Sequence, residues 1–346
     1  MYKIKTSERN NDRATEFETK SLLYLMTKIK NHRIVDLFII DCFNDITGVT
    51  SNYLESWDVQ SKGVSSLTPR TVGKALYTLF SNYISEIDFS HYVLFLPRLK
   101  DSYLDDPQSV VFGINDFKNE KIRDVKLGLQ VEIEKRNDPD VATAHNILQI
   151  DSFLSNVFFI TDKYEKADYI RSIIEFKNIE QLDEEFLTRI FDEIRTQQAA
   201  KKIRNVCGEE IASLRDAEKF DKTIHRKDIE LLVVNRIIGN DLFATKGIPL
   251  YFIQEVRDMN EDDIADLIQD CQSKIGRTLF NKNNRKSFWL LLEEIMSTIS
   301  ENKNIAVRDA FGKISNSLQK KVFSLDEISM LYLIALVKEG LKHENS

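Results

Sequence analysis

The chain has 346 residues, of which 42% are apolar and 30% charged, an ordinary composition for a soluble protein with room for two domains. Its 11 glycines and 5 prolines are few, which favours helices with short connections over an all-β or disordered chain. The net charge of -7 argues against a protein that coats nucleic acid constitutively, because such binding depends on lysine and arginine. Contact with DNA would have to come from a local basic patch or from an assembly.

Three widely spaced cysteines, Cys42, Cys207 and Cys271, contain no Cys-x-x-Cys pair. This pattern argues against a zinc site and a disulfide framework, and it fits a reducing cytoplasm. Residues 1–13 are polar and lack the apolar core of a signal peptide. No window of about 20 apolar residues is available to span a membrane. We therefore expect a cytoplasmic protein that makes no membrane contact.

The first predicted element is a helix over residues 14–30, with Thr15 as a candidate N-cap and apolar residues along one face. At about 100° per residue, Glu18 falls in the middle of that face. A carboxylate that points into a core is costly unless it is paired or binds a metal. The alternative is a first-turn glutamate that the helix dipole favours. Glu16 points away from the apolar face, so we expect it to be exposed.

Two strands are predicted next. An apolar run over residues 34–43 indicates a buried strand, residues 48–52 indicate a turn, and residues 55–62 indicate a second strand. Asp41 and Asp45 share the same parity along the first segment. Either aspartate could therefore supply a carboxylate where that strand ends.

Side chains alternate along a strand, so Gln60 and Lys62 project to one face while Ser61 projects to the other. If the two strands are neighbours, Asp45 joins Gln60 and Lys62, and an oxygen ligand then lies beside a cation. Asp58 shares the parity of Gln60 and Lys62, so it could contact DNA or a second metal. The alternative is a solvated strand face with Asp45 opening a turn.

The remaining pattern predicts a helix over 71–85 and strands over 92–96, 110–114 and 157–160. This order predicts a mixed central sheet flanked by helices. We expect a domain boundary near residue 165. The segments beyond it read as helices, over residues 182–206, 227–238, 249–257, 262–279, 286–300, 305–320 and 324–341.

Basic residues divide into two groups. Those closest in the chain to the predicted site, and therefore able to contact phosphates, are Arg70, Lys74, Arg98 and Lys100. The pair Lys201-Lys202 is expected to lie on a solvated helix face.

The Phe17-Glu18 pair, Asn44-Asp45, the segment Val59-Gln60-Ser61-Lys62 and the helix that follows resemble the PD-(D/E)xK nuclease superfamily in order and spacing. More narrowly, they are similar to the double-strand DNA endonuclease domain of bacterial anti-phage systems. Such domains occur in cyclic-nucleotide-signalling operons and in Lamassu. The resemblance implies an α/β restriction-endonuclease-like core in residues 1–165, followed by a mainly α-helical interaction or oligomerisation domain in residues 166–346.

The resemblance also implies a metal site. Glu18, Asp45, the Gln60 side-chain oxygen and the Ser61 carbonyl would hold Mg²⁺, with Mn²⁺ as an acceptable substitute. Lys62 would orient the attacking water and stabilise charge in the transition state. The alternates are Asp41 in place of Asp45, Glu16 in place of Glu18, and Asp58 as an additional ligand or DNA contact.

The expected function is a metal-dependent endonuclease, cutting double-stranded DNA with little sequence specificity, that acts as the effector of an anti-phage defence system. The resemblance implies activation by oligomerisation or by a partner protein, for example one of the SMC type as in Lamassu. The alternative is a catalytically silent, nuclease-like adaptor that binds a partner through its helical half. An RNA or single-stranded DNA substrate stays open.

Overall fold

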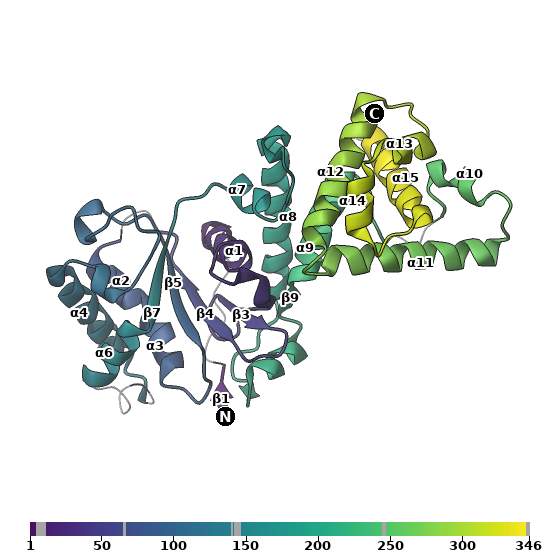
Figure 1. Cartoon of the computed structure of the whole chain (residues 1–346). Coiled ribbons are helices and arrows are strands. Elements are labelled where there is room, and N and C mark those ends of the chain that lie inside the picture. The colour runs from purple at the N-terminus through teal and green to yellow at the C-terminus, as the bar shows by residue number, and fades with distance from the viewer. Residues whose placement is uncertain (5–11, 65–66, 140, 142–146, 244–246, 344–346) are drawn as a thin grey trace. The chain divides into compact units, whose positions relative to one another are not determined.

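Figure 1 shows the computed structural model, which describes residues 1–346 except 5–11, 65–66, 140, 142–146, 244–246 and 344–346. The chain forms two compact units. Unit 1 comprises Met1–Tyr169 and Phe191–Arg226, and unit 2 comprises Ile170–Ile190 and Lys227–Ser346. The chain first passes from unit 1 to unit 2 after Tyr169, near the predicted boundary at residue 165. The return of residues 191–226 to unit 1 was not predicted, so the expected division into 1–165 and 166–346 differs from the structure.

Unit 1 is built around a seven-stranded mixed sheet with the order β6-β7-β5-β4-β3-β2-β9. Strands β4, β5 and β7 run parallel, whereas β9, β2, β3 and β4 pair antiparallel, as do β6 and β7. A separate pair joins β1 (Tyr2–Lys3) to β8 (Glu210–Ile211). The strands of the sheet are β2 (Val35–Ile40), β3 (Ile46–Thr50), β4 (Ser56–Ser61), β5 (His91–Pro97), β6 (Val111–Phe112), β7 (Val157–Asp162) and β9 (Thr223–His225).

The turn predicted over residues 48–52 is correct only at its end, because β3 extends through Gly48 to Thr50 and the chain turns at Ser51 and Asn52. A glycine usually weakens a strand, but Gly48 lies where the sheet is closely covered. A Cβ at this position would lie 3.0 Å from a Val35 methyl and 3.1 Å from a Leu25 methyl. Glycine at this position therefore leaves the room that Leu25 of α1 and Val35 of β2 occupy.

Helix α1 (Asp12–Thr27) packs against β2, β3 and β4. Its Phe17 and Tyr24 rings contact Phe95 of β5 at 5.0 and 5.6 Å between centroids. Thr15 lies inside the helix and is buried, so it is not the predicted N-cap. The opposite face of the sheet is covered by α2 (Pro69–Ala75), α3 (Tyr77–Tyr83), α4 (Asn119–Arg136) and α6 (Ile147–Ser155).

The single helix predicted over 71–85 is two short helices that meet at Leu76. The Thr68 hydroxyl caps α2 by accepting a hydrogen bond from the Thr71 N–H at 3.2 Å. Helices α2 and α4 touch through glycines: a Cβ on Gly73 would lie 1.9 Å from the Val125 carbonyl oxygen. This close approach fixes α2, and with it α3, behind the sheet.

Two further helices follow β7 in the chain, α7 (Lys166–Arg171) and α8 (Glu184–Lys202). The C-terminal part of α8 belongs to unit 1, and after it the chain adds β9 to the edge of the sheet beside β2. Arg226 stabilises the position of this segment in unit 1, because its guanidinium donates hydrogen bonds to the Val35 and Met26 carbonyls at 2.6 and 2.7 Å. Residues from the second half of the chain therefore complete the first unit.

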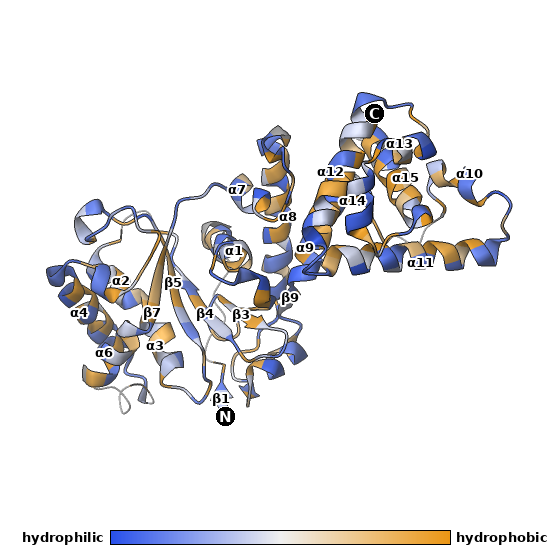
Figure 2. Cartoon of the chain, viewed as in Figure 1, coloured by the Kyte–Doolittle hydropathy of each residue, from blue (hydrophilic) through white to orange (hydrophobic). Residues whose placement is uncertain are grey.

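The described residues of unit 2 form helices joined by turns and irregular segments, and the Phe252 and Tyr332 rings pack 5.2 Å apart in its core. Figure 2 shows a largely hydrophobic α15 beside helices with mixed faces. Within the described ranges, no helix combines the length and apolar character that crossing a bilayer requires. The helices of this unit are α9 (Arg226–Ile238), α10 (Ile253–Val256), α11 (Glu261–Phe280), α12 (Arg285–Glu301), α13 (Val307–Lys313), α14 (Asn316–Gln319) and α15 (Glu327–His343).

Candidate metal and nuclease site

The site is built where β4 ends, opposite the turn that leads into β3. The Asp41 N–H donates to the Asp45 carbonyl at 3.1 Å, and Asp41 has a left-handed backbone with φ 53°. Aspartate tolerates this conformation better than most residues. Because Ile46 pairs with Val59 in the hairpin, the preceding residue, Asp45, lies level with Gln60.

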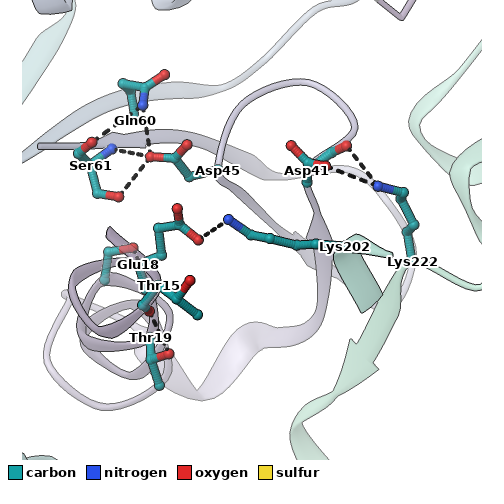
Figure 3. A network of polar contacts seen from close by, with 10 residues as sticks. Thr15, Glu18, Thr19, Asp41, Asp45, Gln60, Ser61, Lys202 and Lys222 are labelled. Atoms are coloured by element: carbon teal, nitrogen blue, oxygen red, sulfur yellow. Dashed lines mark hydrogen bonds and ion pairs between the residues drawn. The ribbon is translucent and has the colours of Figure 1, made fainter. Parts of the chain in front are cut away.

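Asp45, Gln60 and Ser61 are joined by hydrogen bonds, as Figure 3 shows. One carboxylate oxygen of Asp45, Oδ2, accepts from the Ser61 N–H at 2.6 Å, the Ser61 hydroxyl at 2.7 Å and the Gln60 side-chain amide at 2.7 Å. All three residues are buried. The structure therefore brings together these three predicted ligands and leaves the Asp45 Oδ1 atom without a hydrogen bond from the described residues.

The Gln60 amide presents its nitrogen to Asp45, not the oxygen that the sequence pattern predicts as a ligand. Its Nε2 also donates to the Ser61 carbonyl at 3.3 Å, while its Oε1 accepts from the Thr78 hydroxyl of α3 at 2.7 Å. Without a cation, an amide oxygen would be repelled by the carboxylate. The Thr78 hydroxyl both donates and accepts, so it can hold the amide in either orientation.

Glu18 approaches the site from α1 and is 3% exposed, so it faces the interior as its spacing predicts. Figure 3 shows its carboxylate pointing toward the side of Asp45 and Ser61. The Gln60 side chain instead extends to Thr78 of α3, on the other face of the sheet. Glu18 forms an ion pair with Lys202, the last residue of α8. Glu18 therefore approaches the end of β4 from the face that α1 covers, whereas the Gln60 side chain extends to the opposite face.

Lys202 was expected on a solvated helix face, and that expectation is wrong because its side chain is only 4% exposed. Burial lowers the pKa of its ammonium, but the charges of Glu18, Asp45 and Asp41 more than offset this, so the pKa is raised overall. A buried lysine therefore stays charged among three carboxylates. The residue spacing in the sequence could not predict this burial, because the Lys202–Glu18 ion pair joins residues that are far apart in the chain.

The two alternates to the main carboxylates are also ion-paired. Asp41 Oδ2 lies 3.0 Å from Nζ of the fully buried Lys222. Glu16, expected to be exposed, lies 3.0 Å from Lys166 and 3.9 Å from Arg195, with its side chain 34% exposed. The tertiary fold brings basic residues from after β7 onto this side of α1.

Asp58 is fully buried, so a role in contacting DNA does not fit the structure. Its Oδ2 accepts from the side-chain amides of Asn44 at 2.6 Å and Asn82 at 2.8 Å. Burial raises its pKa to about 7; the two amide hydrogen bonds lower it, and the charge of Asp45 raises it further. Asp58 points behind the sheet toward α3 because it shares the parity of Gln60.

Lys62 follows Ser61 directly and is half-buried, with its backbone N–H donating to the Phe95 carbonyl at 3.0 Å. This bond continues the pairing of β4 with β5 and fixes the backbone of Lys62 beside the cluster. The four basic residues predicted to contact phosphates are exposed, and one of them, Arg98, lies 3.1 Å from Asp101; they are Arg70, Lys74, Arg98 and Lys100.

No three His, Cys, Asp or Glu side chains of the described residues form a metal-binding group by themselves. A divalent cation would need Glu18 and Asp45 together with amide or carbonyl oxygens from Gln60 and Ser61. These are hard oxygen donors of the kind Mg²⁺ accepts. The buried ammonium of Lys202 is ion-paired with Glu18 and is influenced by the charge of Asp45, so this part of the site already accommodates a positive charge.

Comparison of the chain with models of protein families, with curated proteins and with solved structures gives no match.

Proposed function

We propose that unit 1 is a metal-dependent endonuclease, a phosphodiester hydrolase that cuts double-stranded DNA with little sequence specificity. The observation that carries this proposal is the hydrogen-bonded group of Asp45, Gln60 and Ser61 at the end of β4, with Glu18 directed toward it from α1. This group combines carboxylate, amide and carbonyl oxygens, and Lys62 follows it directly in the chain. Such a donor set suits phosphodiester hydrolysis assisted by Mg²⁺ or Mn²⁺.

Each residue has a distinct task in this proposal. A bound divalent cation supplies positive charge against the phosphoryl oxygens and lowers the pKa of a water. Asp45 and Glu18 would hold the cation, and the Gln60 side-chain oxygen would serve as a further ligand. The Lys62 ammonium orients the attacking water and stabilises the negative charge that develops on the phosphate.

We further propose that this nuclease is the cytoplasmic effector of a bacterial anti-phage defence system. The support is the resemblance in the order and spacing of Glu18, Asp45 and the Gln60-Ser61-Lys62 triplet. Unit 2 would mediate homo-oligomerisation or binding to a partner defence protein, for example one of the SMC type. The exposed Arg70 and Lys74 on α2 are candidates for contact with the DNA backbone.

The test is plasmid degradation by the purified full chain with Mg²⁺ or Mn²⁺, alone and with products of neighbouring defence genes. Lys62→Ala should abolish cleavage while leaving the circular dichroism spectrum unchanged. Lys313→Ala, which removes an exposed lysine from α13 of unit 2, is the matched control and should cut at the wild-type rate. Undiminished cleavage by Lys62→Ala would rule out this site.

One observation favours a second function, the silent adaptor. The predicted ligands are buried, and Lys202 already balances the charge of Glu18. In that case the cluster would be a structural ion pair in a nuclease-like scaffold. The wild-type chain would then remain inert toward DNA under every metal and partner condition of the plasmid assay.

A further inference from the structure

A lysine ammonium is buried within the acidic cluster of the candidate site. The side chains of Lys202 and Glu18 are 4% and 3% exposed, and the two groups form an ion pair. An ammonium removed from water is stable only where nearby carboxylates replace its hydration. The cluster is therefore arranged to hold a positive charge, and in this structure a side chain provides that charge.

The charges of the cluster divide between two lysines. Lys222 pairs with Asp41 at 3.0 Å and also lies 3.3 Å from the Asp41 carbonyl. Lys202 pairs with Glu18 and interacts electrostatically with Asp45. Glu18 and Asp45 are the same two carboxylates that a divalent cation would need. Lys202 and the cation therefore compete for one set of ligands.

Lys202 is well placed to leave the cluster, because it is the last residue of α8. The next residue, Ile203, lies in a bend and is 79% exposed. Unwinding of the last residue of α8 can turn Lys202 outward while the rest of the helix keeps its hydrogen bonds. The flexible four-carbon stem of the lysine side chain makes this movement easier. Lys222, which is fully buried, has no comparable route.

We propose that Lys202 is a resident cation that keeps the site in a resting state, and that it must withdraw from Glu18 before a divalent metal ion binds there. This inference rests on the proposed metal-dependent nuclease function. It makes Lys202 a positioning residue that acts through Glu18 and Asp45. Any event that pulls on the end of α8, such as assembly or partner binding, would then favour metal binding.

The first test uses the wild-type chain. An amine-reactive acetylating reagent is applied with and without saturating Mg²⁺, and the modified lysines are quantified by peptide mass spectrometry. Labelling of Lys202 should rise several-fold with Mg²⁺, while labelling of Lys222 stays low as the internal control. Calorimetry on the same sample establishes whether Mg²⁺ binds. Bound Mg²⁺ with Lys202 still protected would overturn the proposal.

The second test measures Mn²⁺ affinity by electron paramagnetic resonance for the wild type, Lys202→Met and Lys222→Met. Removal of the competing charge should tighten Mn²⁺ binding by about tenfold or more in Lys202→Met, and by clearly less in Lys222→Met. Equal affinity in the wild type and Lys202→Met would refute the resident cation but keep the metal site. Absence of binding in every folded variant would instead refute the proposed nuclease site.

The variant Lys202→Met leaves the Glu18 carboxylate buried without its partner, which is strongly destabilising. Its melting temperature should therefore rise more with Mn²⁺ than that of the wild type, because the metal replaces the missing charge. If Lys202→Met does not fold even with Mn²⁺, the labelling of wild-type Lys202 decides the question.

Discussion

The buried aspartate behind the site gives the sharpest stability prediction. Asp58 accepts hydrogen bonds from Asn44 and Asn82, and its Oδ1 is buried without a hydrogen-bond partner among the described residues. Burial raises its pKa from 3.8 to about 7. In the metal-free protein, the folded state therefore keeps a proton that the unfolded state releases at a lower pH.

The sign of the effect follows from proton linkage. Between about pH 4 and pH 7 the folded state binds more protons than the unfolded state, so the contribution of Asp58 to stability falls as the pH rises. A pKa rise from 3.8 to about 7 corresponds to a loss on the order of 4 kcal/mol once the pH exceeds 7. Below about pH 4 the loss disappears.

The substitution Asp58→Asn removes this titration but keeps an oxygen that accepts from Asn44 and Asn82. We expect it to match the wild type near pH 4 and to be more stable by up to about 4 kcal/mol at pH 8. Urea denaturation of both proteins in EDTA, from pH 4 to pH 8, measures the difference. Parallel stability curves over that range would refute the assignment of a proton to Asp58.

Two further predictions concern packing and thiol reactivity. Gly73→Ala places a methyl group 1.9 Å from a backbone oxygen of α4 and should lower the free energy of unfolding by about 3 kcal/mol. Gly312→Ala is the control, because a Cβ there meets no described atom within 4 Å beyond the local backbone of its own helix. This variant should be neutral or slightly stabilising in the same denaturation assay. In the native protein, Ellman's reagent should modify the exposed Cys207 rapidly and spare the buried Cys42 and Cys271. Burial raises the pKa of the Cys42 thiol to about 12 and also raises the pKa of Cys271, so neither thiol forms the reactive thiolate readily. Rapid reaction of all three thiols would contradict the packing around Cys42 and Cys271.

The sequence predicted elements that have a clear hydrophobic period. The apolar face of α1, with Glu18 at its centre, and the apolar runs of β2, β5 and β7 all correspond to observed elements. The mixed sheet flanked by helices and the helical second unit also agree with the predicted fold class. Local pattern was sufficient here because each segment buries one face against its neighbours.

Other features depend on contacts that no local pattern records. The close packing of Leu25 and Val35 over Gly48 is a tertiary contact, and the three-residue strand β9 is too short to have a period of its own. The burial of Lys202 and Lys222 depends on residues 191–226 returning to unit 1. The alternation along β4 predicted the direction of Gln60 and Asp58, but the orientation of the Gln60 amide depends on Thr78.

The central claim is that Asp45 and Glu18 hold a divalent cation at the end of β4. Anomalous diffraction from crystals saturated with Mn²⁺ tests it directly. We expect a peak about 2.2 Å from a carboxylate oxygen of Asp45, with the Gln60 oxygen turned toward it and Lys202 moved away from Glu18. An unoccupied cluster at saturating Mn²⁺, with Lys202 still against Glu18, would contradict it.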